Sequence, residues 1–166
     1  AQDFEEFLEM IQTDEINTVA APGPGSLGDL VFKRMSQLDG YPVSSDDWEL
    51  VPYDGGAEVG QAVISGETDV GCTAATAFAR QYDGENFVPL VSASSQGAGG
   101  FPDTPSVTDL DYPNIDTVGQ NTRCMWLTPG ISDEKQSLMV DAVESAINSD
   151  QLQSWAEEAN QRTANI

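Results

Sequence analysis

Short apolar runs alternate with longer helical patterns along this chain, and no other feature limits its possible folds so strongly. Apolar residues recur at helical spacing at 4–11, 26–38, 57–65, 132–148 and 152–159. Short strand-like runs occur at 17–20, 49–53, 69–72, 87–91, 114–118 and 122–127. Strands that alternate with helices predict an α/β fold with a mainly parallel sheet flanked by helices. Residues 92–105, rich in Ser, Gly and Pro, are expected to form a long surface loop.

The charge balance narrows the range of partners. Among 166 residues, Asp and Glu total 28 while Lys and Arg total 6, which gives a formal net charge of −22. Nucleic acid is not expected as a partner, because phosphate binding needs a basic face. The acidic residues are dispersed over the chain, a pattern that favours a halophilic protein. At about 1 M salt the Debye length falls to roughly 3 Å, so self-repulsion is screened. An acidic protein from a low-salt environment is the alternative.

The composition also limits the chemistry. The chain has no histidine, which excludes Ser-His-Asp or Cys-His catalysis and histidine-based metal sites in this sequence. We predict no catalytic residue, no metal ligand and no cofactor. Cys72 and Cys124 lie in apolar, strand-like surroundings, where free cysteine packs as a small hydrophobe. Buried thiols are the favoured interpretation, and a disulfide in an exported protein is the alternative.

Two glycine-rich segments each connect a predicted strand to a predicted helix. Glycine turn 1 is Gly23-Pro24-Gly25-Ser26, and glycine turn 2 is Asp54-Gly55-Gly56-Ala57. In a parallel sheet such turns lie at the carboxyl ends of the strands, beside helix N-termini. Free backbone N–H groups and the helix dipole favour an anion there, and glycine lets that anion approach the backbone. Ordinary strand-to-helix connections are the alternative interpretation.

Glycine turn 1 also fits a second motif. Gly23, Gly25 and Gly28 have the spacing G-x-G-x-x-G of dinucleotide-binding loops. That motif needs an acidic residue at the end of the second strand, about 20 residues further on. Asp46 and Asp47 precede the next predicted strand, whereas Asp54 follows it but comes somewhat late. A dinucleotide-binding oxidoreductase fragment is therefore kept as the alternative to a binding protein.

Five short motifs occur in an order typical of one family. They are Ala20-Ala21-Pro22-Gly23-Pro24-Gly25-Ser26, Val51-Pro52-Tyr53-Asp54-Gly55-Gly56, Gly66-Glu67-Thr68-Asp69, the segment 102–109 that begins Pro-Asp-Thr-Pro, and Trp126-Leu127-Thr128-Pro129-Gly130. In this order, over nearly the whole chain, they resemble the substrate-binding receptors of the tripartite tricarboxylate transporter family, also called Bug proteins. Two departures concern turn 1: Ala20 and Ala21 replace Gly-Ser and remove a hydroxyl, and Pro24 removes one N–H.

The resemblance implies a lobe of the type II periplasmic-binding-protein kind in a receptor that is not an enzyme. Such a receptor captures a small carboxylate-bearing solute and delivers it to a membrane permease. It would be extracytoplasmic, in the periplasm or at the cell surface, with a lipid anchor possible in a full-length protein. Residues 1–120 would form the second, ligand-binding lobe. Residues 121–166 would form the crossover strand and C-terminal helices that return to a first lobe, whose N-terminal part is absent from this sequence.

On this interpretation, ten residues from the strand-to-helix connections form the ligand site. They are Gly23, Pro24, Gly25, Ser26, Tyr53, Gly55, Gly56, Ala57, Thr73 and Ala74. The amides of the two glycine turns would hold one carboxylate, directly and through bridging water. Tyr53 would form a wall of the site, and Thr73 and Ala74 would line its floor.

Overall fold

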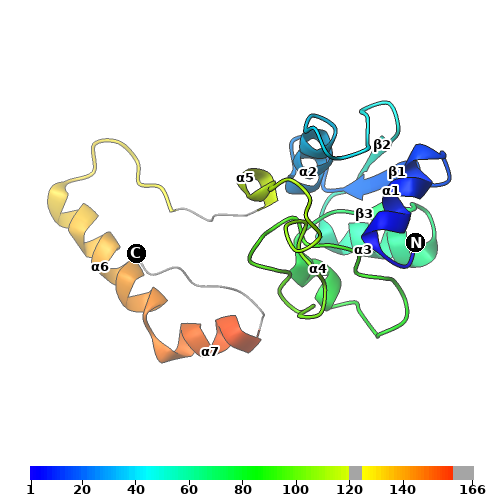
Figure 1. Ribbon diagram of the computed structural model, residues 1–166. Coiled ribbons are helices and arrows are strands. Elements are labelled where there is room, and N and C mark those ends of the chain that lie inside the picture. Colours follow the sequence, from blue (N-terminus) through cyan, green and yellow to red (C-terminus); the bar gives the residue numbers. More distant parts are fainter. Residues whose placement is uncertain (120–124, 159–166) are drawn as a thin grey trace. The chain divides into compact units, whose positions relative to one another are not determined.

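The computed structural model describes residues 1–119 and 125–158, in two units, Ala1–Asn121 and Thr122–Ile166. The first unit contains a three-stranded parallel sheet with the strand order β2-β1-β3 (Figure 1). The central strand β1 (Thr18–Ala21) pairs with β2 (Glu49–Pro52) on one side and β3 (Val70–Gly71) on the other. A mixed α/β fold with a parallel sheet flanked by helices is thereby confirmed.

Local capping explains where the helices of the first unit begin and end. These helices are α1 (Phe4–Gln12), α2 (Leu27–Met35), α3 (Gly56–Ser65), α4 (Ala75–Ala79) and α5 (Asp116–Gly119). Asp3 caps α1, because its carboxylate accepts a hydrogen bond from the Glu6 N–H at 2.8 Å. Gly66 ends α3 in the left-handed conformation, with φ of 72°. Both features are predicted by the sequence.

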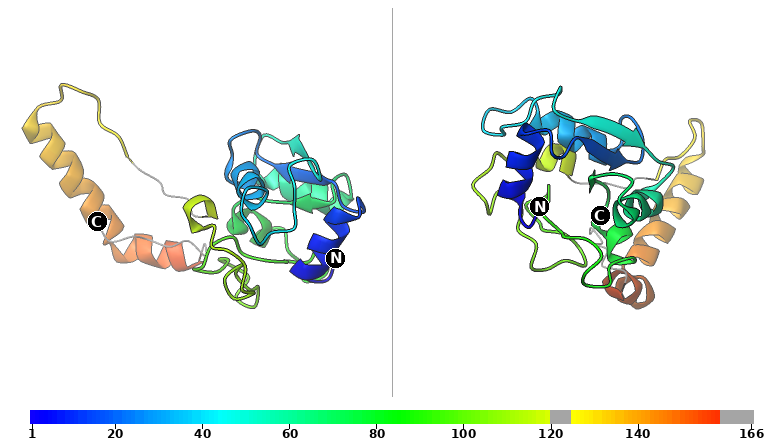
Figure 2. Two further views of the ribbon diagram at one scale, coloured as in Figure 1. Left: turned by 45° about the horizontal axis from the view of Figure 1, so that its top comes forward. Right: turned by 90° about the vertical axis from the view of Figure 1, so that its right-hand side faces the viewer.

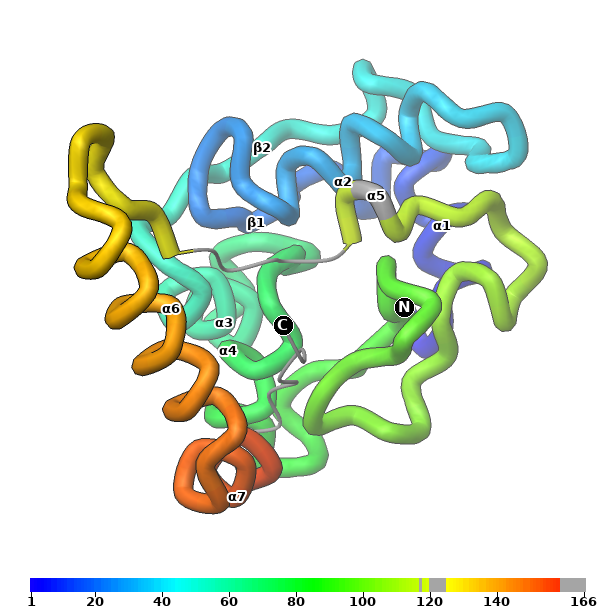
Figure 3. Tube along the Cα trace, turned by 90° about the vertical axis from the view of Figure 1, so that its left-hand side faces the viewer, coloured from blue at the N-terminus to red at the C-terminus, as the bar shows by residue number. Residues whose placement is uncertain are grey.

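Helices cover both faces of the sheet. On one face, Val19 of β1 is buried in a cluster with Phe4 of α1 and Phe32 of α2. On the other face, Gly71 of β3 lies against Val59 of α3, whose Cγ1 would be 3.1 Å from a Cβ added at Gly71. Figure 3 shows α2 and α3 on opposite sides of the strands. This arrangement is expected because the crossovers from β1 to β2 and from β2 to β3 run in opposite directions along the sheet, and right-handed crossovers then place their helices on opposite faces.

The strand predicted at residues 87–91 is wrong. This segment has no ladder pairing, and the nearest strand-like contact is an isolated bridge between Ser92 and Ser106. Pro89 lacks an N–H donor, and the Phe87 ring packs against those of Phe78 and Tyr82. Residues 92–105 form no regular helix or strand, as predicted for a loop (Figure 2).

The strand predicted at residues 114–118 is also wrong, because α5 begins there. The Asn114 side chain accepts the Asp116 N–H at 2.6 Å, and the Ile115 carbonyl accepts the Val118 and Gly119 N–H groups at 2.9 Å each. A local side-chain cap of this kind competes with extended pairing. Of the strand predicted at residues 122–127, residues 122–124 lie outside the described part, and 125–127 form no strand.

The second unit contains α6 (Asp133–Ile147) and α7 (Asp150–Glu158), which confirms the two helices predicted there. Apolar side chains of both helices are exposed: 67% of Leu138 on α6 and 53% of Trp155 on α7 are accessible. No residue of α6 is buried. Across residues 1–119 and 125–158, no helix has the length and apolar character needed to cross a membrane. The assignment of the two units to receptor lobes stays a prediction.

Candidate functional site

Three strand-to-helix connections meet at the carboxyl edge of the sheet. They are residues 22–26 after β1, 53–55 after β2 and 72–74 after β3. The Tyr53 N–H donates to the Ala21 carbonyl at 3.0 Å, and the Cys72 N–H donates to the Ala20 carbonyl at 2.9 Å. The chain crosses from β1 to β2 and then back past β1 to β3, so its direction along the sheet reverses after β2. Open parallel sheets bind ligands outside the carboxyl ends of their strands at such a reversal.

All ten predicted site residues belong to these three connections or to the first residues of α3. Glycine turns 1 and 2 therefore lie at one edge of the sheet, although binding of a ligand by them stays a prediction. The two turns differ in how their backbone N–H groups are used. This difference decides which turn can accept an anion.

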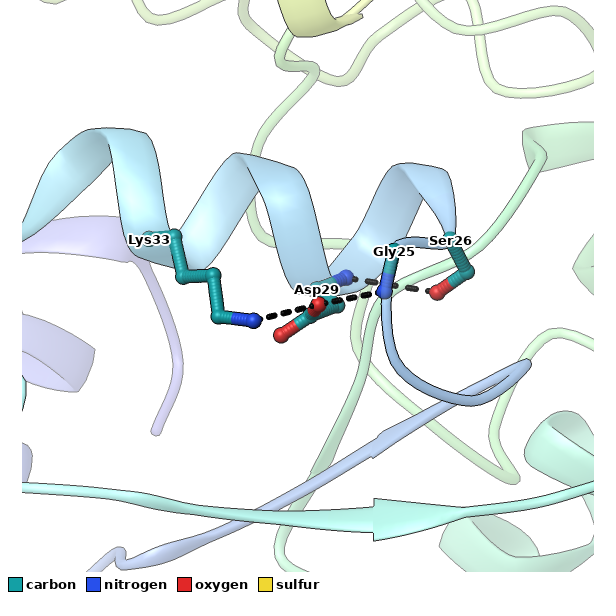
Figure 4. Close-up of polar contacts among 4 residues, drawn as sticks. All are labelled: Gly25, Ser26, Asp29 and Lys33. Carbon is teal, nitrogen blue, oxygen red and sulfur yellow. Dashed lines mark hydrogen bonds and ion pairs between the residues drawn. The ribbon is translucent and has the colours of Figure 1, made fainter.

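Glycine turn 1 is closed by a carboxylate from its own helix (Figure 4). Asp29 Oδ2 accepts the Gly25 N–H at 2.6 Å and a hydrogen bond from Lys33 Nζ at 2.7 Å. The Asp29 N–H in turn donates to Ser26 Oγ at 3.4 Å, so Ser26 and Asp29 form a variant of the capping box. An acceptor supplied by the chain itself thus occupies the amide that the sequence assigns to a ligand.

The other amides of glycine turn 1 are also paired or missing. The Gly23 N–H donates to the Ala21 carbonyl at 2.7 Å, and the Ser26 N–H donates to the Gly23 carbonyl at 3.2 Å. Pro24 has no N–H to offer. A ligand carboxylate would therefore have to compete with existing acceptors at this turn.

Asp29 is ionised at neutral pH although it is fully buried. Burial alone raises the pKa of its carboxyl, but the hydrogen bonds from Lys33 and Gly25 and the positive charge of Lys33 outweigh it. The pKa therefore lies below the ordinary value of 3.8. Asp29 Oδ1 is buried as well, and no group in the described part of the chain forms a hydrogen bond with it.

Glycine turn 2 has no equivalent occupant. Gly55 is the N-cap of α3 and, as a glycine, has no side chain that could make a capping hydrogen bond. The first turn of a helix leaves N–H groups without acceptors in the helix. Glu58 stands beside this turn, because its Oε2 would lie 3.1 Å from a Cβ added at Gly55. The N-terminus of α3 is therefore the better place at this edge for an external anion.

The third connection, residues 72–74 after β3, packs against the first residues of both α2 and α3. A Cβ added at Gly56 would lie 3.0 Å from Thr73 Oγ1, which places that hydroxyl against the start of α3. A Cβ added at Gly28 would lie only 1.9 Å from the Cys72 carbonyl oxygen, so the start of α2 packs directly on the same connection. Ala74 follows as the N-cap of α4. The structure thus brings Thr73 together with Gly55, Gly56 and Ala57.

Tyr53 contributes its backbone N–H to the edge, where it donates to the Ala21 carbonyl. Burial raises the pKa of this hydroxyl, and the negative charge of Glu67, just beyond α3, raises it further. The buried Tyr53 hydroxyl has no hydrogen-bond partner within the described residues. The role of Tyr53 as a wall of the site stays a prediction.

Cys72 packs against the hydrophobic core, and burial raises the pKa of its thiol to about 12. Such a thiol is a small hydrophobe rather than a nucleophile. Cys124 lies outside the described residues, so the alternative of a Cys72–Cys124 disulfide is not tested. Within the two described ranges, no cluster of three or more His, Cys, Asp or Glu side chains is placed to hold a metal ion.

The residues that sequence reasoning missed are Asp29, Lys33 and Glu58. Two signals could have revealed the first pair: Ser26 and Asp29 have the capping-box spacing, and Asp29 and Lys33 have the i,i+4 spacing of helix ion pairs. Glu58 is the third residue of α3, a position where an acidic side chain can reach back to the N-cap.

The geometry of glycine turn 1 also bears on dinucleotide binding. Gly23 and Gly25 have left-handed φ values of 85° and 78°, and Gly28 packs closely on the third connection. These are steric roles that the glycines of the dinucleotide motif perform. A pyrophosphate, however, would meet the Asp29 carboxylate at the Gly25 N–H.

Comparison with known proteins gives no match. No family model matches the chain, no curated protein is significantly similar to it, and no solved structure matches it significantly. The motif resemblance to tripartite tricarboxylate receptors therefore stays an expectation, and the function has to be argued from the site.

Proposed function

We propose that this protein binds a small carboxylate-bearing solute at the carboxyl edge of its sheet. In this proposal the chain is part of an extracytoplasmic receptor with type II lobes, which delivers the solute to a membrane permease of the tripartite tricarboxylate kind. The observation that carries the binding proposal is the uncapped N-terminus of α3 beside Thr73. The receptor role rests on the order of the sequence motifs.

The local and global electrostatics at this edge oppose each other. The N-terminus of a helix carries about half a positive charge, and its N–H groups point at a bound anion. A net charge of −22 repels the same anion at long range. Salt shortens that repulsion to within roughly 3 Å at about 1 M, whereas direct hydrogen bonds persist. Binding should therefore be measured in concentrated salt.

The first experiment is calorimetric titration of the chain with acetate, propionate, succinate and citrate in about 1 M KCl. Heat from at least one acid supports the proposal, and no heat with any of them contradicts it.

Two matched variants locate the site. Glu58→Gln removes a negative charge beside glycine turn 2, so we expect a severalfold gain in carboxylate affinity at low salt and a smaller gain at high salt. Glu49→Gln makes the same change at the first residue of β2, on the opposite edge of the sheet, and should leave the affinity nearly unchanged. Equal effects of the two variants would mean that only net charge matters.

Thr73→Val tests the hydroxyl beside α3 without changing the size of the side chain. Loss of one hydrogen bond to a charged ligand should weaken binding by about 1.5–3 kcal/mol. Thr68→Val is the matched control, because Thr68 lies before β3, at the other edge of the sheet.

The dinucleotide alternative has a direct test. The steric fit of Gly23, Gly25 and Gly28 favours it, whereas the Asp29 carboxylate opposes it. Titration with NAD, followed by quenching of tryptophan fluorescence, should give no saturable signal if the carboxylate proposal is right.

A further inference from the structure

The second unit exposes many apolar side chains and has almost no core of its own. Among residues 125–158, Ala156 is the one buried residue. Of the ten large apolar side chains that are exposed in the described chain, seven lie in this range: Met125, Trp126, Leu127, Leu138, Met139, Val140 and Trp155. Helices of the length of α6 and α7 are only marginally stable in water unless an apolar face is packed. The unit therefore needs a surface that covers α6.

The apolar residues of α6 form a stripe on one half of the helix. At about 100° per residue, apolar and acidic side chains fall on opposite halves. The stripe consists of Leu138, Met139, Ala142, Val143, Ala146 and Ile147, whereas Asp133, Glu134, Asp141 and Glu144 lie on the other half. None of the stripe residues is buried, and 67% of Leu138 and 40% of Met139 are exposed. Ten helical residues give the stripe a length of about 15 Å.

The charges at the two ends of the stripe are opposite and equally spaced from it. Lys135 is the only basic residue in the sequence 125–158, and it lies three positions before Leu138 on the same half of the helix. It forms no ion pair within the described residues. Asp150, the first residue of α7, lies three positions after Ile147. A second α6 that ran antiparallel over the stripe would therefore bring Asp150 to Lys135 at both ends.

The charge distribution favours such a second copy over other partners. A strongly acidic partner is repelled by the net charge of −22, and Lys135 is the only basic residue of 125–158 that could attract it. A partner with a basic rim would find the acidic residues of α6 on the half of the helix that faces away from the stripe. A copy of α6 also keeps its own acidic residues away from the contact, so two stripes can meet without like charges between them.

We infer that the stripe of α6 is a docking surface for a second copy of this chain, with the two α6 helices antiparallel in an isologous dimer. In this register Leu138 of one copy lies opposite Ile147 of the other. Ala142 lies next to the twofold axis, where its small side chain lets the helices approach closely. Lys135 of each copy lies beside Asp150 of the other, and this exposed pair fixes the direction of the helices more than the strength of the dimer. The inference does not depend on the proposed function.

The size of the stripe and the charge of the chain set the expected strength. A standard interface buries about 800 Å² on each partner, which is more than the side chains of one short stripe provide, so we expect dissociation in the micromolar range. The net charge of −22 on each copy opposes association at long range. Salt screens this repulsion, so the dimer should be about tenfold or more tighter in about 1 M KCl than in about 0.1 M KCl.

Sedimentation equilibrium of the chain over a series of protein concentrations tests the inference at both salt concentrations. Ala142→Glu places a charge in the stripe beside the twofold axis and should weaken the dimer by about tenfold or more. Ser137→Glu is the matched control, because it adds the same charge at an exposed position on the acidic half of α6. It should change the dissociation constant by no more than about twofold. Circular dichroism shows whether both variants keep their helices.

A charge exchange tests the antiparallel direction. Lys135→Glu should weaken the dimer severalfold, because each copy then opposes Glu to Asp150. Adding Asp150→Lys to this variant restores both the opposite charges and the original net charge, so the dissociation constant should return towards that of the unaltered chain. A double variant that keeps its helices but stays as weak as Lys135→Glu would overturn the antiparallel arrangement.

The other outcomes are equally distinct. A monomer at every protein concentration in about 1 M KCl would mean that a different partner covers the stripe, and would overturn the inference. Equal weakening by Ala142→Glu and Ser137→Glu would show that net charge and not the stripe controls association, which also overturns it. Growth into larger particles without a defined dimer would do the same. Failure of carboxylate binding would contradict the proposed function and leave this inference unchanged.

Discussion

Replacing Gly28 by alanine tests the packing that holds the carboxyl edge together. A Cβ at this position would lie 1.9 Å from the Cys72 carbonyl oxygen and 2.9 Å from Ala21 Cβ. Real Cβ atoms essentially never come closer than 3.0 Å to such atoms, so α2 and the third connection must separate by about 1.1 Å. Neither neighbour can rotate away, because one is backbone and the other is a Cβ.

The expected loss of stability follows from two opposing effects. Overpacking a rigid contact costs up to about 3 kcal/mol, while the higher helix propensity of alanine returns at most about 1 kcal/mol. The net destabilisation is therefore about 2 kcal/mol, which lowers the melting temperature of a chain of this size by about 6 °C. Separation of α2 from residues 72–74 should also weaken carboxylate binding, because Thr73 moves with that connection.

Gly60 in α3 provides the matched control. It is also a buried helical glycine, but the atom nearest to its added Cβ is Gln81 Nε2 at 2.5 Å, at the far end of a flexible side chain. Gln81 can turn aside at the cost of its hydrogen bond to the Ala57 carbonyl, so Gly60→Ala should stay within about 1 kcal/mol of the unaltered protein. Thermal unfolding followed by circular dichroism measures both variants in the same salt. A Gly28→Ala protein as stable as Gly60→Ala would refute the packing argument.

Three further predictions concern pH, salt and buried polarity. Asp69 accepts hydrogen bonds from Asn17 and Thr18; burial raises the pKa of its carboxyl, but these bonds lower it below 3.8. The stabilisation that the ionised Asp69 carboxylate gives the folded protein is therefore complete above pH 3.8 and is lost as the pH falls through the pKa of the folded state. Asp69→Asn should lower the free energy of unfolding by about 1 kcal/mol at pH 7. Urea unfolding should show this difference shrinking below pH 3.8. Raising KCl from about 0.1 M to about 1 M should raise the melting temperature, because the charge of −22 repels itself less, and a flat or falling curve would contradict halophilic character. Thr68→Val should stabilise by about 1 kcal/mol in urea unfolding, because the buried Thr68 hydroxyl has no partner in the described structure, and a loss of stability would show that it has one.

The sequence predicts best those elements whose ends are fixed by their own side chains. Asp3 and the apolar spacing that follows it locate α1, and Gly66 locates the end of α3. The wrong strands lie where local contacts override an apolar run. Pro89 and the aromatic packing of Phe87 prevent a strand at residues 87–91, and the Asn114 cap turns the next run into α5. Such contacts depend on residues brought together by the fold or on capping that an apolar pattern does not reveal.

For the candidate site, the sequence predicts the position of the residues but not whether their N–H groups are free to bind a ligand. Glycine-rich turns after strands place residues at the carboxyl edge, because parallel strands share their direction. Whether a turn can accept a ligand depends on which N–H groups are already used, and that depends on single side chains. Asp29 folds back onto Gly25, whereas Glu58 stands beside Gly55 without capping it. A pattern of glycines cannot distinguish these two outcomes.

The exposed apolar side chains of α6 and α7 set a limit on every measurement made in salt. In dilute buffer, mutual repulsion between strongly charged molecules keeps Leu138 and Trp155 of neighbouring copies apart. Salt that stabilises the fold by screening repulsion within one molecule also screens the repulsion between molecules. Attraction between the exposed apolar side chains of different copies should therefore grow with salt and with protein concentration. We therefore expect an optimum ionic strength, above which light scattering rises before unfolding begins.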